Sequence, residues 1–146
     1  MIAFDTNILV YAHREDSTWH EAADRCVSVV AESGAPWAIP WPCVHEFLAI
    51  VTHPRIYDPP TPLEHALEQV ACWLEMPTLV MLTETTQHWP SLRTLLEAGR
   101  AIGPQVHDAR IAALCRQHGV AELWTADRDF GRFAGLRFKN PLVSVG

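Results

Sequence analysis

The chain has 146 residues, of which 49% are hydrophobic and 19% are charged. This is the composition of a folded globular protein and excludes a disordered one. The formal net charge of −6 excludes a general nucleic-acid coat protein, which would be basic. It does not exclude a nuclease, because carboxylates that bind a divalent cation add to the negative count. The length fits one domain, residues 1–146, with a core of its own.

The sequence predicts neither a membrane segment nor a secretion signal. The apolar stretch 35–51 contains three prolines, His45 and Glu46, which a membrane span would not tolerate. The N-terminus has no basic segment and no small-residue cleavage site. We therefore expect a cytoplasmic protein without membrane attachment. The four cysteines show neither metal-ligand nor redox spacing, so we expect free and mostly buried thiols.

Short strands and helices alternate along the chain. In chain order the predicted elements are a strand at 2–5, helices at 6–13 and 17–32, a strand at 37–39, helices at 42–53 and 63–76, a strand at 79–82, helices at 88–98 and 106–118, a strand at 122–125, a turn or short helix at 127–133, and an edge strand at either 136–138 or 142–145. Ser17 is expected to cap one helix, and Thr61 to form a capping box with Glu64 at another. The alternation predicts an α/β fold with a mostly parallel sheet of four to five short strands, flanked by helices.

Acidic residues follow two of the predicted strands. Asp5 closes the first strand, and Asp127 and Asp129 come directly after the strand that ends at Thr125. In parallel sheets, functional sites form beyond the carboxyl ends of the strands. Taken singly, Asp5 is equally explained as a helix N-cap, and the later pair as an Asp-rich turn.

Two further acids lie on predicted helices in apolar surroundings. The residues three and four positions from Glu46 are apolar or small, and Asp108 stands at the head of an apolar stripe. A rim glutamate and a first-turn aspartate are the simple alternatives. Together, however, the acids on separate segments indicate a site for Mg²⁺ or Mn²⁺, which prefer hard oxygen ligands. The sequence shows no Gly-rich phosphate loop and no zinc spacing.

The segments that carry these acids resemble the PIN domain. They are FDTNILVYA at 4–12, HDARIAAL at 107–114 and TADRDF at 125–130, together with Glu46. Within that family they are most similar to the VapC-type toxins of bacterial toxin–antitoxin pairs, over essentially the whole chain. The resemblance implies a PIN-like three-layer fold. It also implies a Mg²⁺-dependent endoribonuclease that cleaves structured RNA such as tRNA or ribosomal RNA.

The resemblance assigns a role to each residue of the motifs. It implies that the catalytic carboxylates are Asp5, Glu46, Asp108 and Asp127. It implies that the metal ligands are Asp5, Asp108, Asp127 and Asp129. Glu46 would bind through water or position the attacking water. The polar residues that would orient the carboxylates are Thr6, Asn7 and Thr125.

The resemblance also implies partners. These are an RNA substrate, a cognate VapB-type antitoxin, and a second copy of the chain in a homodimer, which with antitoxin would give a heterotetramer or larger assembly. The arginines that could contact an RNA backbone are Arg14, Arg55, Arg93, Arg100, Arg110, Arg116, Arg128 and Arg132. For most of them, a solvated helix face is the simpler interpretation.

Two other functions remain open from the sequence. In a receiver or phosphatase domain, Asp5 would be the nucleophile that becomes phosphorylated, and it would need a nearby lysine. Lys139 is the single lysine of the chain. A binding module would keep the fold as an RNA- or protein-binding surface without catalysis. The complete set of acids argues against this last interpretation.

Overall fold

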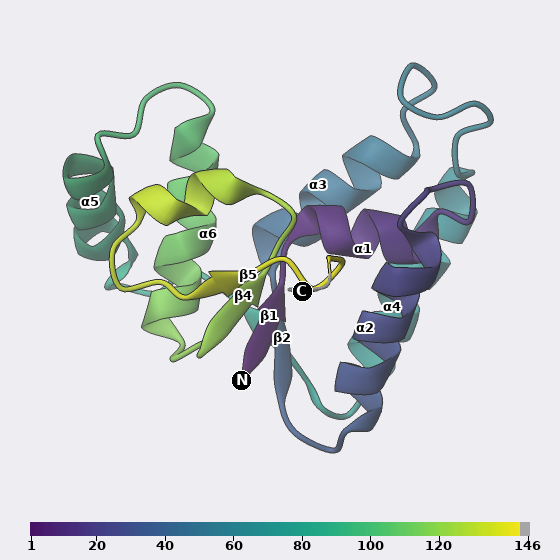
Figure 1. The fold of residues 1–146 in the computed structure, drawn as a ribbon, viewed down its shortest axis with the longest axis horizontal. Helices are drawn as coiled ribbons and strands as arrows, with labels where there is room; N and C mark the ends of the chain where they lie inside the picture. The colour runs from purple at the N-terminus through teal and green to yellow at the C-terminus, as the bar shows by residue number, and fades with distance from the viewer. Residues whose placement is uncertain (144–146) are drawn as a thin grey trace.

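The computed structural model describes residues 1–143 and contains one five-stranded sheet, shown in Figure 1. Its strands are β1 (Ile2–Phe4), β2 (Trp37–Pro40), β3 (Leu79–Leu82), β4 (Glu122–Trp124) and β5 (Phe138–Lys139). The order is β3-β2-β1-β4-β5, and every neighbouring pair is parallel. The predicted α/β class and parallel sheet are therefore confirmed. The edge strand lies near the first of the two predicted positions, while the second extends beyond the described residues.

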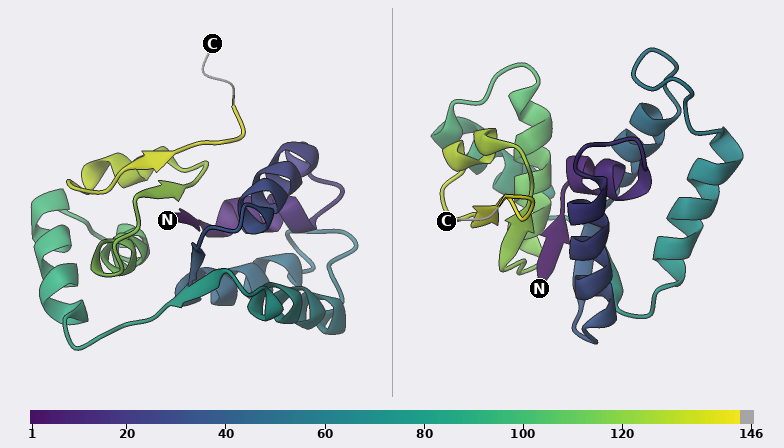
Figure 2. Two further views of the ribbon diagram at one scale, coloured as in Figure 1. Left: turned by 90° about the horizontal axis from the view of Figure 1, so that it is seen from below. Right: turned by 45° about the vertical axis from the view of Figure 1, so that its right-hand side comes forward.

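Helices cover both faces of the sheet, which gives three layers. They are α1 (Thr6–His13), α2 (His20–Glu32), α3 (Trp41–Val51), α4 (Leu63–Glu75), α5 (His88–Gly99), α6 (Gln105–Gln117) and the 3₁₀ helix η1 (Arg128–Arg132). Helices α1 to α4 lie on one side, and α5 and α6 on the other (Figure 2). This follows from right-handed crossovers, because the chain moves one way from β1 to β3 and then returns across the sheet to β4.

The reversal of direction fixes where a site can form. Strands β1 and β4 are neighbours, but the connections that follow β1 and precede β4 lie on opposite faces. Such a switch point leaves a crevice beyond the carboxyl ends of the two strands. Those ends carry Asp5 and Asp127.

The core holds β1 rigidly at the centre. Phe4 is fully buried, and its ring packs edge-on against Trp37 and Trp124, with centroids 5.7 and 5.8 Å away. Edge-to-face aromatic pairs add about 0.5–1.5 kcal/mol beyond the burial of their surface. Since Phe4 directly precedes Asp5, this packing determines where the carboxylate lies.

Two predicted helix caps are wrong. Helix α2 begins at His20 without a side-chain cap, and the Ser17 hydroxyl accepts instead from the Trp19 amide in the preceding turn. Helix α4 begins at Leu63, also uncapped. Thr61 is buried and its hydroxyl accepts from Arg14, so a tertiary contact replaces the capping box.

All four cysteines are free, as predicted, although Cys72 is exposed. Cys43 and Cys115 are buried, and Cys26 is partly buried. None of the helices within residues 1–143 is both long enough and apolar enough to span a bilayer.

Candidate active site

Asp5 connects the end of β1 to the start of α1. Its backbone amide donates to the Trp124 carbonyl of β4 (3.0 Å), and its Oδ1 accepts from the Thr6 amide (2.8 Å). The side chain is only 5% exposed. Asp5 is therefore the helix cap that the simple interpretation predicts, and it also lies at the carboxyl edge of the sheet. The two interpretations are compatible.

Thr125 holds this arrangement together from the end of β4. Its hydroxyl donates to Asp5 Oδ2 (2.7 Å) and accepts from the Asn7 side-chain amide (3.3 Å) and the Asp127 backbone amide (3.0 Å). The side-chain oxygen Oδ1 of Asn7 in turn accepts from the Ala126 backbone amide (3.1 Å). A hydroxyl has one proton and two lone pairs, so Thr125 uses its full hydrogen-bonding capacity here.

Helix α3 places Glu46 and Cys43 on the same side as Asp5. Glu46 Oε2 accepts from the Thr6 hydroxyl (2.7 Å), and the Cys43 thiol lies 3.6 Å from Asp5 Oδ1. Burial raises the pKa of Cys43 well above its usual value, so the thiol stays protonated and donates to the carboxylate. This contact was not predicted from the sequence, although Cys43 lies three residues before Glu46 and therefore on the same helical face.

Three acids gather on the other side of the crevice. Asp108 on α6, with Asp127 and Asp129 around the start of η1, offers carboxylate oxygens that all lie within 4.8 Å of one another. Asp127 Oδ1 also accepts from the Asp129 amide (2.8 Å), which caps η1. The first turn of α6 and the loop after β4 therefore bring together acids that are 19 to 21 positions apart in the sequence.

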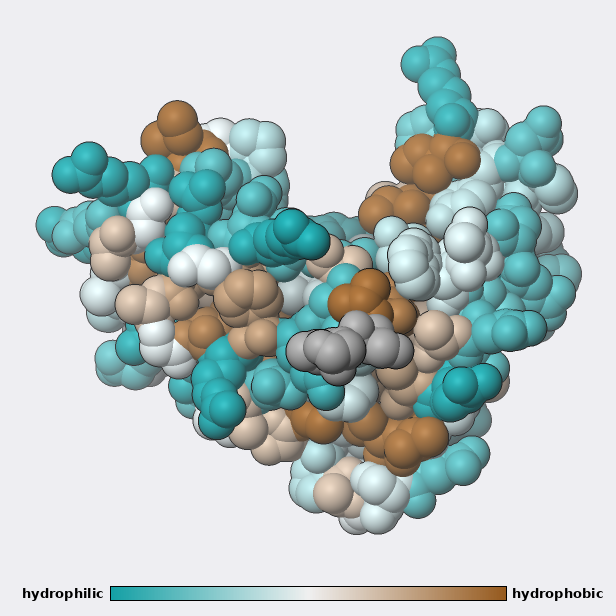
Figure 3. All heavy atoms as spheres, in the orientation of Figure 1, coloured by the Kyte–Doolittle hydropathy of each residue, from teal (hydrophilic) through white to brown (hydrophobic). Residues whose placement is uncertain are grey.

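A cavity of about 320 Å³, here called the acidic cavity, joins the two groups of acids. It is lined by Asp5, Thr6, Asn7, Val10, Tyr11, Glu46, Ile50, Tyr57, Asp108 and Asp127. Figure 3 shows the molecule hollowed between the α5–α6 side and the loop after α3. Asp129 belongs to the oxygen cluster but does not line the cavity. The apolar and aromatic lining residues were not predicted, since nothing in their local sequence marks them.

The site holds two carboxyl groups that resist ionisation. Burial raises the pKa of Asp5 to about 6, with a smaller contribution from Glu46, against the opposing hydrogen bonds from Thr125 and Thr6. Burial also raises the pKa of Asp108 to about 6, and the charges of Asp127 and the other acids add to it. Metal-free, the site therefore takes up protons around pH 6.

The donor set fits a divalent cation. The clustered ligand atoms are carboxylate oxygens, the type that Mg²⁺ and Mn²⁺ prefer. Within residues 1–143, none of the site acids forms an ion pair with an arginine, lysine or histidine. Their mutual repulsion is therefore uncompensated by protein charge, and a bound cation would relieve it.

Comparison with known proteins places the chain in a family. The PIN domain family matches residues 2–136. Ribonuclease VapC48 of Mycobacterium tuberculosis is 33% identical over 139 residues, which cover 94% of this chain and 95% of that protein. The chain is a PIN-domain protein of the VapC ribonuclease family.

Solved structures of VapC proteins share this fold. M. tuberculosis VapC20, a toxin that cleaves the sarcin–ricin loop, superposes with a TM-score of 0.69 at 16% identity, over 93% of this chain and 96% of that one. VapBC2 of Rickettsia felis, bound to a DNA fragment from its promoter, gives a TM-score of 0.67 at 21% identity, over 95% and 98%. The predicted PIN-like three-layer fold is therefore confirmed.

The hydrogen bonds of Thr125 generate a first prediction. Thr125→Val keeps the shape of the side chain but leaves Asp5 Oδ2 and the Asn7 amide without their partner. We expect the free energy of unfolding to fall by about 1–3 kcal/mol. Thr125→Ser retains the hydroxyl and is the control. Urea unfolding measures both, and a valine variant as stable as wild type would contradict the assigned role.

The raised pKa values predict how stability depends on pH. Because the pKa of Asp5 is higher in the folded protein than its usual 3.8, the metal-free protein loses stability as pH rises from 4 to 7, by up to about 3 kcal/mol. Mg²⁺ should therefore raise the melting temperature at pH 7.5 far more than at pH 4.5.

Asp108→Asn tests by mutation whether repulsion among the site acids destabilises the metal-free protein and whether Mg²⁺ relieves it. Removing this charge should stabilise the metal-free protein at pH 7.5 and weaken the effect of Mg²⁺. Asp108 is a cleaner choice than Asp5, because Asn at position 5 would place an amide beside Thr125, whose hydroxyl already makes all the hydrogen bonds that it can. Asp24→Asn, an exposed acid on α2, is the control. If Mg²⁺ raised the melting temperatures of the wild type, Asp108→Asn and Asp24→Asn equally, a cation site among these acids would be refuted.

Proposed function

We propose that this chain, as one PIN domain over residues 1–146, is the toxin of a type II toxin–antitoxin pair and a Mg²⁺-dependent endoribonuclease. The observation that carries the proposal is the acidic cavity. It brings Asp5, Glu46, Asp108 and Asp127 to the carboxyl edge of the sheet, beside the oxygen cluster that includes Asp129. Membership of a family of ribonucleases supports hydrolysis of RNA as its chemistry.

Each acid has a proposed role. Asp108, Asp127 and Asp129 would hold the cation, with Asp5 on the facing side. Mn²⁺ could replace Mg²⁺ at such a site. When bound, the cation would lower the pKa of a water and neutralise charge that develops on the phosphate. Thr6 holds one oxygen of Glu46 and leaves the other to accept a hydrogen bond from the attacking water.

Structured RNA, such as tRNA or ribosomal RNA, is the proposed substrate. The structural relative VapC20 is a sarcin–ricin loop cleaving toxin, which supports an RNA loop as the target. The charge distribution also favours a polyanion. Residues 100–146 contain seven of the eleven arginines and lysines but only four of the seventeen acids, and three of those four belong to the oxygen cluster.

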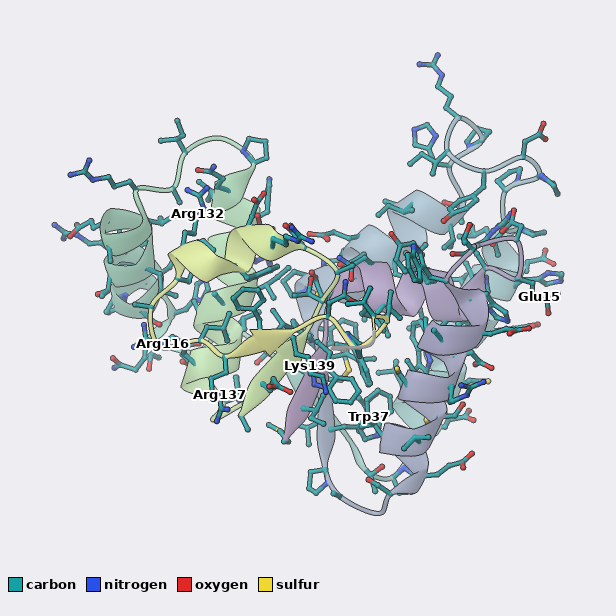
Figure 4. All side chains as sticks on the ribbon, viewed as in Figure 1. Glu15, Trp37, Arg116, Arg132, Arg137 and Lys139 are labelled. Atoms are coloured by element: carbon teal, nitrogen blue, oxygen red, sulfur yellow. The ribbon has the colours of Figure 1, made fainter. Side chains whose placement is uncertain are left out.

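The arginines differ in whether an acid pairs with them. Arg14, Arg93 and Arg110 are paired with acids, and Arg14 has a side chain only 10% exposed, which makes these three poor candidates for RNA contact. A second group, here called the basic edge, has no acidic partner within residues 1–143; it consists of Arg116, Arg128, Arg132, Arg137 and Lys139. Figure 4 labels all of these except Arg128 on the side of the molecule that carries α6 and β5. Arg25, Arg55 and Arg100 also have no such partner within residues 1–143, but they lie on α2, in the loop after α3 and at the end of α5.

The proposed partner is a VapB-type antitoxin. VapBC2 of R. felis is a toxin–antitoxin complex of the same fold, which supports this partner. We further propose a homodimer, a heterotetramer or larger assembly with antitoxin, and a cytoplasmic location.

The two competing functions find less support. A phosphorylated Asp5 would need a lysine beside it, but the Lys139 ammonium lies over the Trp124 ring, 5.3 Å from its centroid. A catalytically inactive RNA- or protein-binding module would have no reason to keep carboxylates whose repulsion destabilises the fold.

Cleavage of total bacterial RNA by the purified chain, free of any partner, tests the proposal. Mg²⁺ should give discrete fragments, and EDTA should abolish them. Asp108→Asn should lower the rate about a hundredfold or more, because metal-ion catalysis contributes several kcal/mol. Asp108→Asn, purified identically, controls for contaminating nucleases, and Asp24→Asn controls for the effect of a substitution outside the site. Equal cleavage by wild type and Asp108→Asn, or no cleavage by folded wild type, would refute the proposed activity.

The basic edge generates a separate prediction. Arg137 directly precedes β5 and Lys139 is its last residue. The two are two positions apart along the extended chain, so we expect their side chains to face the same side. Replacing both by Gln should raise KM for RNA. It should also reduce the slope of log KM against the logarithm of the salt concentration by about 2, because two phosphate contacts are lost. Arg93→Gln, on an exposed ion pair of α5, is the control. An unchanged salt slope in the double variant would show that RNA does not contact this edge.

A further inference from the structure

Part of the wall of the acidic cavity cannot hold a cation. Val10, Tyr11, Ile50 and Tyr57 line it beside the acids and offer two aromatic rings and two aliphatic side chains. The volume of about 320 Å³ lies at the lower end of the range for ligand pockets. A cavity of this size has room for about one nucleotide unit.

Tyr57 is held in place from outside the cavity. The Arg14 guanidinium carbon lies 4.2 Å from the centroid of the Tyr57 ring. Arg14 is itself fixed, because it donates to Asp16 Oδ2 (2.6 Å), the Pro59 carbonyl (2.9 Å) and the Thr61 hydroxyl (3.2 Å). Its guanidinium covers one face of the ring. Since Tyr57 also lines the cavity, it presents the other face or its edge to the interior.

We propose that Tyr57, with Tyr11, forms a subsite that binds one unpaired RNA base by stacking, and that Arg14 positions the Tyr57 ring. This inference rests on the proposed function. Proteins bind unpaired bases by stacking them on aromatic side chains, whatever the sequence, because every base has a π face. A base is also uncharged, so the neighbouring carboxylates do not repel it, and its amino groups can donate to them. The base nearest the scissile phosphate would therefore enter the cavity.

Substitutions at Tyr57 test the subsite kinetically. Tyr57→Leu keeps an apolar side chain but removes the ring, and it should raise KM for RNA roughly five- to a hundredfold, with a smaller change in kcat. Tyr57→Phe keeps the ring and should behave like the wild type. Trp89→Leu is the control, because Trp89 on α5 is 62% exposed and does not line the cavity. Thermal unfolding establishes that each variant is folded.

A binding measurement separates this subsite from the proposed catalysis. The probe is 2-aminopurine riboside 5′-monophosphate in Mg²⁺, whose fluorescence falls when its base stacks. We expect quenching by wild type and Tyr57→Phe but not by Tyr57→Leu, and weak competition by ribose 5-phosphate, which lacks a base.

The two proposals fail in different ways. RNA cleavage with unchanged KM in Tyr57→Leu, or equal quenching by all three proteins, would overturn the subsite and leave the ribonuclease activity standing. Quenching that depends on Tyr57 in a folded protein that cleaves no RNA would support the subsite as a base-binding site and overturn the activity.

Discussion

The hydrogen bond from Thr125 to Asp5 joins residues 120 positions apart, and the rest of the site depends on it. It connects the ends of β1 and β4, the two strands between which the chain reverses its direction across the sheet. The same hydroxyl accepts from Asn7 at the start of α1 and from Asp127 before η1. One side chain thus holds the carboxylate of Asp5 and the backbone of Asp127, and ties both to the sheet edge.

This rigidity supports an arrangement that is unfavourable in itself. Burial away from water raises the pKa of Asp5 and of Asp108 to about 6, and repulsion from the neighbouring carboxylates adds to it. A flexible edge would let the acids move apart. The buried packing of Phe4 against Trp37 and Trp124 and the saturated hydroxyl of Thr125 keep them in place, so the free energy of the fold maintains a site ready for a cation.

The sequence predicted most of the fold because its signals are local and periodic. Strands β1, β2 and β3 are short and apolar, and Gly or Pro separates most helices, so the predicted boundaries agree with the observed ones to within a few residues. The two wrong caps have different causes. Ser17 accepts from the Trp19 amide in a local turn, two residues along the chain, whereas Thr61 bonds to Arg14, from which it is 47 positions away. Contacts of that kind leave no local pattern.

The residues of the site also divide into those that a local sequence pattern predicts and those that only contacts between distant segments bring into place. The acids could be found because each stands out against apolar sequence, and the order of parallel strands brings their ends to one edge. Tyr11 and Tyr57 could not be found in this way, because a tyrosine within an apolar helix or in a proline-rich loop is unremarkable. Only the fold shows that Arg14, a residue whose sequence suggests RNA contact, instead lies behind Tyr57. The carboxylates therefore follow from the motif alone, whereas the residues that would select a substrate depend on how the loop after α3 packs against the end of α1.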